Sequence, residues 1–171
     1  EKYLSLNYEP SGPIPRQIKT DMPKLRQILI NLIGNALKFT EQGGVTIVSR
    51  YTANTAQSLL TIDVTDTGVG MTGEQVNKVF EAFVQADNTI TRRFGGTGLG
   101  LSISKKFALA LGGDITISSQ LGQGSTFSIS LPVEVANATD MISKEELGIV
   151  EYADESTPEG QWVFPAAKIL V

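Results

Sequence analysis

Two periods of apolar residues run through this chain, and they predict where strands and helices lie. Alternation of apolar and polar positions predicts strands, and a polar stretch over 53–58 predicts the loop of a hairpin. The predicted strands are 4–8, 45–51, 59–66, 115–117 and 127–131. Pro132 ends the last of them, because proline has no N–H to donate to a neighbouring strand.

Helical spacing predicts three helices. Asp21 caps the first, which accommodates Pro23 in its first turn and runs to Phe39. Gly43 and Gly44 are expected to close it. Two further helices are expected at 74–80 and 101–111. The segment 84–97 between them is expected to be a loop. This order predicts an α+β fold of two layers, with the helices on one face of a mixed, mostly antiparallel sheet.

Composition narrows the classes of function. The net charge is −4 and no run of lysine or arginine is present, which argues against a surface for nucleic acid or anionic membranes. With no cysteine, the chain forms neither disulfides nor thiolate zinc sites. No apolar stretch approaches the roughly 18 residues of a membrane span, so we expect no direct membrane contact from this fragment. Glu1 in place of methionine predicts a piece of a longer protein.

A polar face on the first predicted helix carries metal-ligand and phosphate-binding chemistry. Asn31, Asn35 and Lys38 lie together at spacings of four and three, beside a broad apolar arc. The amide oxygen of asparagine suits Mg²⁺, and lysine provides a point charge for a phosphate. The alternative is that these side chains form the solvated face of an amphipathic helix.

Asp66 stands at the end of an alternating strand. By period two it points to the same side as the apolar residues of that strand. A carboxylate that faces the core is costly unless it receives hydrogen bonds, and the amino group of adenine is a suitable donor. Gly68 and Gly70 permit positive φ and a close approach of the backbone to a flat ring. The alternative is that Asp66 and Thr67 only open a turn.

A glycine-rich stretch precedes the last predicted helix. Backbone N–H groups at such a junction attract phosphate oxygens, helped by the helix dipole. The stretch is not a P-loop, since no Gly-Lys-Ser/Thr follows, and no strand leads into it as in a dinucleotide fingerprint. Arg92 and Arg93 lie just before it, within reach of a triphosphate over a mobile loop. A flexible linker and two surface charges are the alternatives.

Together these motifs resemble the catalytic and ATP-binding domain of sensor histidine kinases, in the superfamily that also contains gyrase B and heat-shock chaperone ATPases. The resemblance covers about residues 1–132. The matching segments are DMPKLRQILINLIGNALKFT for the N box, DTGVGM for the G1 box, VFEAFVQAD for the F box, GGTGLGLSI for the G2 box and GQGSTFSISLP for the final hairpin. The resemblance implies the Bergerat ATP-binding fold, with ATP and Mg²⁺ as cofactors.

The resemblance also implies site residues. Asp66 reads adenine with support from Thr126, while Phe80 and Phe83 pack at the base of a lid. The implied residues are Asn31, Lys38, Arg92 and Arg93 for catalysis, Asn35 and Asn31 for the metal, and Asn35, Asp66, Gly68, Gly70, Phe80, Phe83, Gly96, Thr97, Gly98, Leu99, Gly100 and Thr126 for the nucleotide.

The implied reaction is transfer of the γ-phosphate of ATP to a histidine. The acceptor is expected on a separate dimerisation domain, because this chain contains no histidine. The resemblance further implies a cytoplasmic location, as part of a membrane-bound sensor kinase. A regulatory module that holds ATP or ADP without transfer is the second hypothesis. A serine-directed kinase of the anti-sigma type is a third, against which the F box argues.

The end of the chain differs in character from the rest. Residues 133–167 lack periodicity and are expected to be a linker. The last four residues, 168–171, resemble the first strand of a receiver domain, as found in hybrid histidine kinases. The alternative is a C-terminal extension that packs on the core.

Overall fold

The main sheet of this protein has five strands. The computed structural model describes residues 3–54, 57–82, 98–135 and 140–147. Within them the strand order is β1-β4-β5-β7-β6. The strands are β1 Ser5–Pro10, β4 Gly44–Thr52, β5 Leu59–Asp66, β6 Asp114–Gln120 and β7 Gly124–Pro132. β1 runs parallel to β4, and the other neighbouring pairs are antiparallel.

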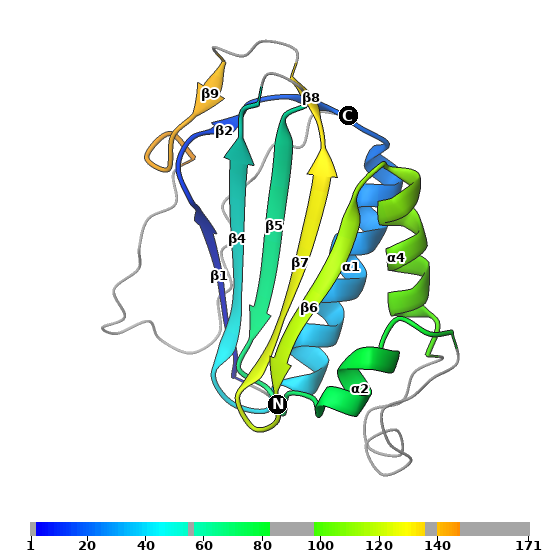
Figure 1. Ribbon diagram of the computed structural model, residues 1–171. Coiled ribbons are helices and arrows are strands. Elements are labelled where there is room, and N and C mark those ends of the chain that lie inside the picture. Colours follow the sequence, from blue (N-terminus) through cyan, green and yellow to red (C-terminus); the bar gives the residue numbers. More distant parts are fainter. Residues whose placement is uncertain (1–2, 55–56, 83–97, 136–139, 148–171) are drawn as a thin grey trace, which may run out of the picture.

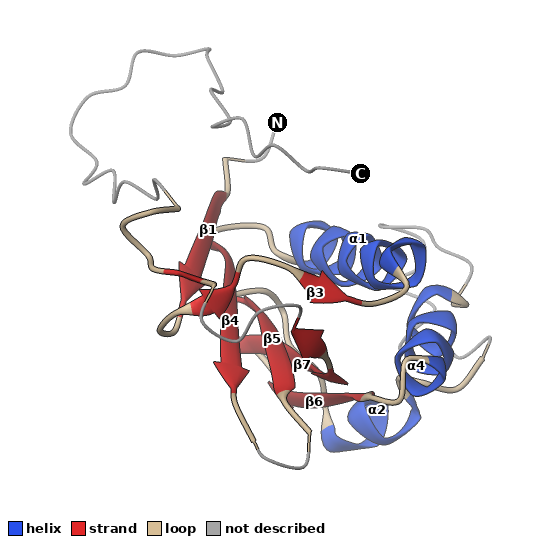
Figure 2. Cartoon of the chain, turned by 90° about the horizontal axis from the view of Figure 1, so that it is seen from above, coloured by secondary structure: helices blue, strands red, loops and turns tan. Residues whose placement is uncertain are grey.

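The helices of the described residues lie on one side of this sheet. They are α1 Met22–Phe39, α2 Gly73–Lys78 and α4 Gly100–Ala110. α1 and α4 lie side by side behind the sheet in Figure 1, and the view from above in Figure 2 shows the two layers. The predicted α+β fold, with a mixed and mostly antiparallel sheet, is therefore confirmed.

α1 begins as predicted. The Lys24 N–H donates to the Asp21 carboxylate at 3.2 Å, and Pro23 occupies the first turn, where its missing N–H costs no hydrogen bond. Four buried residues at helical spacing turn one face of α1 toward the sheet. They are Leu25, Ile28, Leu32 and Ala36.

α1 ends at Phe39, as predicted, but the expected closure by Gly43 and Gly44 is wrong. Thr40 adopts extended backbone instead (φ −97°, ψ 126°) and ends the helix. The Thr40 hydroxyl donates to the carbonyl of Ala36 at 2.7 Å and satisfies one of the last carbonyls of the helix. Gly43, with φ +95°, lies in the turn that leads into β4.

Every second residue of the central strands faces the helices, and this inner face forms the core. Cross-strand register places Val64, Phe127 and Ile117 in one row and Ile62, Ile129 and Ile115 in the next. Five of these six side chains are buried. Removing an aliphatic side chain of this size from water contributes about 1.5–3 kcal/mol, so these rows hold the helices on the sheet.

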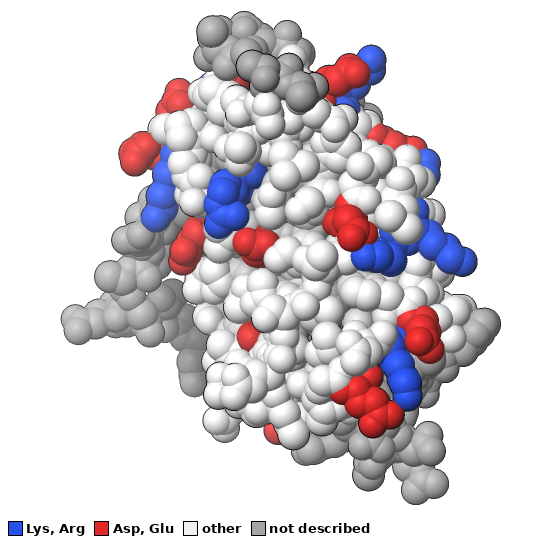
Figure 3. Space-filling view, in the orientation of Figure 1, with Lys and Arg blue, Asp and Glu red and all other residues white. Residues whose placement is uncertain are grey.

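The outer face of the sheet is lined mainly by hydroxyl side chains. Thr46, Thr65 and Thr126 form one row across it. Arg50 Nη1 lies 3.9 Å from Asp63 Oδ2 on the same face. Acidic and basic groups alternate on the side of the molecule seen in Figure 3, without a broad patch of either sign. Among the described helices, none has the length and apolarity that crossing a membrane requires.

The segment after Pro132 differs from the linker that the sequence predicted. β8 (Glu134–Val135) pairs with β3 (Ile18–Lys19), and β9 (Met141–Ile142) pairs with β2 (Ile14–Pro15). Val133 is only 6% exposed, and its N–H donates to the Ser58 carbonyl at 3.0 Å. The first part of the expected linker therefore packs on the domain. The expected receiver strand at 168–171 lies outside the described residues.

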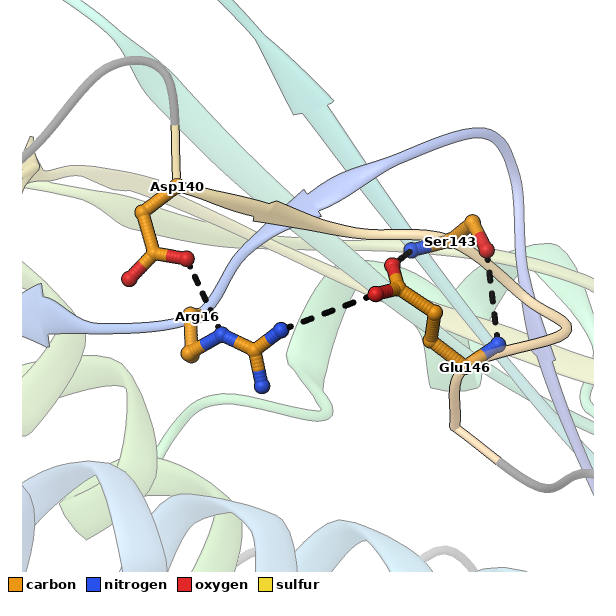
Figure 4. Close-up of polar contacts among 4 residues, drawn as sticks. All are labelled: Arg16, Asp140, Ser143 and Glu146. Carbon is orange, nitrogen blue, oxygen red and sulfur yellow. Dashed lines mark hydrogen bonds and ion pairs between the residues drawn. The ribbon is translucent and has the colours of Figure 1, made fainter.

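Arg16 fastens this segment to the strand region before α1 (Figure 4). Its Nε lies 3.0 Å from Asp140 Oδ1, and its Nη2 lies 3.8 Å from Glu146 Oε1. Glu146 is oriented by Ser143, since the Ser143 N–H donates to Glu146 Oε2 at 3.0 Å and the Glu146 N–H donates to Ser143 Oγ at 3.3 Å. Half-exposed pairs of this kind contribute at most about 1 kcal/mol each, so the buried Val133 is an equally important attachment.

Candidate functional site

A row of polar side chains crosses the sheet at the end of its apolar inner face. Asp66 on β5 lies opposite Ser125 on β7, which lies opposite Ser119 on β6. These three residues are termed the polar row. Asp66 is 5% exposed, so its predicted direction toward the core is confirmed. Ser119 Oγ lies 2.9 Å from Ser125 Oγ and accepts from the Met71 N–H at 2.8 Å.

The Asp66 carboxylate is largely shielded from water. The Gly68 N–H donates to Asp66 Oδ1 at 2.8 Å, which is the turn considered as the alternative role of this residue. Burial raises the pKa of Asp66 above its usual 3.8, while backbone hydrogen bonds from Gly68 and Ser125 act in the opposite direction. A buried carboxylate whose burial outweighs its hydrogen bonds gains from a further donor, and a ligand can supply one.

Two glycines bring the backbone close to the polar row. A Cβ on Gly68 would lie 2.8 Å from Asp66 Oδ1 and 2.9 Å from the carbonyl carbon of Phe39. Gly70 has φ +64°, and a Cβ there would overlap the carbonyl of Gln120. Both positions therefore require glycine. Gly68 has no space for a Cβ, and Gly70 has neither the space nor a backbone conformation that other residues readily adopt.

We expect Gly68→Ala to lower the free energy of unfolding by about 1–3 kcal/mol, because its Cβ would press on Asp66 and Phe39. Gly73→Ala is the matched control, since nothing lies within 4 Å of its Cβ position. Urea denaturation followed by circular dichroism measures both variants. Equal midpoints would show that the backbone around Gly68 adapts, contrary to this expectation.

We expect Asp66→Asn to stabilise the ligand-free domain more at pH 7 than at pH 4. The pKa of Asp66 is raised in the folded state, so the folded protein binds this proton more tightly than the unfolded chain does. Its contribution to stability is greatest below the unfolded pKa, near 3.8, and declines as the pH rises through the folded pKa. The melting temperatures of variant and wild type at the two pH values test this. A difference independent of pH would contradict it.

Asn31 faces α4 rather than solvent. Its Nδ2 donates to Ser104 Oγ at 2.9 Å. A Cβ on Gly100, the first residue of α4, would lie 3.0 Å from Asn31 Cγ and closer still to its Oδ1. The two helices therefore lie close together where α4 begins. The interpretation of this face as merely solvated is wrong for Asn31.

Asn35 and Lys38 follow Asn31 along α1, and both are half-buried. Lys38 Nζ lies 5.0 Å from the centroid of the Phe39 ring. Among the described aspartate and glutamate residues, no three are grouped so that they could hold a metal. The amide oxygens of Asn31 and Asn35 are the donors that α1 offers to a hard cation.

The amino end of α4 lies beside this asparagine face. Gly98, with φ +69°, and Leu99 lead into the helix, and within the described residues no side chain caps it. An uncapped helix end leaves backbone N–H groups and the positive end of the helix dipole for an anion. Five of the predicted residues lie outside the described residues, and their roles stay predictions. They are Phe83, Arg92, Arg93, Gly96 and Thr97.

Thr126 does not lie where its predicted support of Asp66 would place it. It pairs with Thr65, and their hydroxyls are 3.0 Å apart on the outer face. Ser125, and not the predicted Thr126, takes the position opposite Asp66. Alternation counted back from Phe127 would have indicated Ser125, because a change of one residue moves a side chain to the other face.

Phe80 packs against the core, and its predicted place at the base of a lid stays a prediction. Its ring meets that of Phe127 edge to face, with centroids 6.4 Å apart and planes at 85°. Such aromatic pairs add about 0.5–1.5 kcal/mol beyond the area that they bury. Phe127 is two residues from Ser125, so this contact borders the polar row.

The sequence that forms this site matches a known family. Residues 20–135 match the family of histidine kinase-, DNA gyrase B-, and HSP90-like ATPases. The chain belongs to this family. Over 156 residues it is 38% identical to hybrid signal transduction histidine kinase B of Dictyostelium discoideum, an alignment that covers 91% of this chain and 8% of that protein. Over 172 residues it is 36% identical to the aerobic respiration control sensor protein ArcB of Escherichia coli, which covers the whole chain and 20% of ArcB.

Solved structures agree with this assignment. The full-length structure of ShkA in complex with AMPPNP superposes with a TM-score of 0.68 at 38% identity, over 79% of this chain and 27% of ShkA. The catalytic domain of histidine kinase ThkA superposes with a TM-score of 0.59 at 27% identity, over 75% of this chain and 78% of that domain. The chain is thus an ATP-binding catalytic domain of the sensor histidine kinase type, and it spans a small part of the kinases that it matches in sequence.

Proposed function

We propose that this domain binds ATP with Mg²⁺ and transfers the γ-phosphate to a histidine on another domain. The observation that carries the proposal is the buried carboxylate of Asp66, set in the polar row at the end of the inner face of the sheet. Membership of the ATPase family supports the same reading.

The polar row would receive the adenine. Asp66 would accept a hydrogen bond from the adenine amino group, which supplies the donor that a buried carboxylate lacks. The absence of a Cβ at Gly68 and Gly70 lets the turn after β5 pack closely on Phe39 and Gln120, which keeps Asp66 in place.

The start of α4 and the polar face of α1 would receive the phosphates. The uncapped end of α4 suits phosphate oxygens, and Lys38 adds a positive charge. The amide oxygens of Asn31 and Asn35 fit Mg²⁺, which takes few protein ligands and keeps several waters. When bound, Mg²⁺ neutralises charge that develops on the transferring group. Arg92 and Arg93 are proposed to contribute in the same way.

Phosphate transfer to a supplied acceptor tests this proposal. The 171 residues contain no histidine, so the experiment adds a dimerisation domain that carries one, together with labelled ATP and Mg²⁺. Label on the acceptor, and none on an acceptor whose histidine is replaced by glutamine, is the expected result. Nucleotide binding without transfer to any supplied acceptor would favour a regulatory module. No nucleotide binding would contradict the reading of Asp66.

The partners and location of the whole protein are also proposed from its relatives. The Dictyostelium relative is named a hybrid kinase, which supports a receiver domain after this one and a phosphoacceptor domain before it. ArcB is named a sensor protein, in line with a cytoplasmic domain of a membrane-bound sensor. The match spans only 8% and 20% of these two relatives. The sequence on either side of this chain would therefore test whether the proposed receiver and phosphoacceptor domains are present.

A further inference from the structure

Lys105 on α4 makes three contacts that tie this helix to two other parts of the domain. Its Nζ lies 2.5 Å from Asp114 Oδ1 and donates to the Ile115 carbonyl at 2.7 Å, both at the start of β6. It also lies 5.0 Å from the centroid of the Phe80 ring, just after α2. One ammonium group therefore joins α4, β6 and the end of the α2 region.

These contacts are partly shielded from water. The Lys105 side chain is 28% exposed, whereas the neighbouring Lys106 is exposed. Lys105 also lowers the pKa of Asp114, so this carboxylate is charged at neutral pH. The Lys105 ammonium makes a charge-assisted hydrogen bond, an ion pair and a cation–π contact. Together these restrict the side chain far more than a single surface ion pair would.

α4 is held on two sides within the same turn. Ser104 accepts from Asn31 on the α1 side, and Lys105 reaches the sheet on the other. Both lie roughly one turn after Gly100, at 3.6 residues per turn. Gly100 lies so close to Asn31 that no space for a side chain exists there, so the position of α4 sets the contact between its first residue and Asn31.

We propose that Lys105 is a positioning residue for phosphate binding. It holds α4 against β6, so that the start of the helix keeps its place beside Asn31 and its N–H groups point to one location. This role rests on the proposed function, in which the amino end of α4 binds the phosphates. Lys105 itself does not touch the nucleotide.

Three variants of the whole chain test the role by calorimetric titration with ATP and with ADP. Lys105→Met keeps the aliphatic stem and removes the charge, Lys105→Arg keeps the charge, and Lys106→Met is the matched control on the exposed side. We expect Lys105→Met to weaken ATP binding on the order of tenfold, below the hundredfold cost of a full 1 Å misplacement. ADP binding should weaken less, because one phosphate fewer depends on the helix.

Rescue and stability separate positioning from general support. Lys105→Arg should restore the ratio of ATP to ADP affinity to that of the wild type, and Asp114→Asn should shift it in the direction of Lys105→Met. A lower melting temperature of Lys105→Met with an unchanged ratio would overturn the inference, as would equal behaviour of Lys105→Met and Lys106→Met. A wild type that binds neither nucleotide would overturn the proposed function instead, and this inference with it. If Lys105→Met does not fold, the ratio for Asp114→Asn decides.

Discussion

Asp66→Ala is expected to abolish nucleotide binding. Asp66 is buried at the end of the inner face, and this burial raises its pKa. The amino group of adenine would donate a further hydrogen bond to its carboxylate. Loss of a hydrogen bond to a charged group, together with an amino group left unpaired in the site, costs about 3 kcal/mol or more. This corresponds to more than a hundredfold in Kd. Calorimetric titration with ADP and ATP measures it.

Asp63→Ala is the matched control for this variant. Asp63 lies on the same strand but on the outer face, where Arg50 Nη1 is 3.9 Å from its carboxylate. We expect its nucleotide affinity to remain within a factor of about two of the wild type, since exposed pairs contribute little. Equal affinities of wild type and Asp66→Ala, with the wild type binding normally, would refute the adenine assignment.

Asn35→Ala is expected to suppress phosphate transfer while largely preserving binding of metal-free nucleotide. Asn35 lies one turn after Asn31 on the polar face of α1, and its amide oxygen is proposed to hold Mg²⁺. Removal of one group that stabilises transition-state charge commonly costs about 10²–10³ in rate. The measurement compares transfer to a supplied histidine domain with nucleotide affinity, with and without Mg²⁺.

Asn77→Ala is the control, because Asn77 is an exposed asparagine on α2, away from α1. It should leave both transfer and Mg²⁺ dependence unchanged. If Asn35→Ala transfers phosphate at the rate of Asn77→Ala, Asn35 does not hold the metal, and Asn31 becomes the candidate to substitute next.

Local chemistry made much of the fold predictable. The cap at Asp21 and the helical spacing after it describe α1 to its last residue, Phe39. Period-two alternation placed Asp66 on the inner face before any strand pairing was known. The helix cap, the helical spacing and the strand alternation each depend on residues only a few positions apart, so a single sequence is enough to predict them.

Features that depend on pairing were not predictable in the same way. Thr126 and Ser125 are adjacent in the chain, and only the register of β7 against β5 decides which of them faces Asp66. The group that closes α1 also required the structure, because the Thr40 hydroxyl, and not the glycines after it, satisfies the Ala36 carbonyl.

Patterns along the chain establish which classes of residue this protein contains, namely an amide face on a helix, a carboxylate at the inward end of a strand and a glycine-rich junction. Packing in the folded chain determines which of them meet. Asn31 bonds Ser104 across 73 positions of sequence, and Lys105 joins α4 to β6. Residues after Pro132 return to pair with 14–19. Such contacts arise from packing between distant segments, and periodicity along the chain carries no information about that packing.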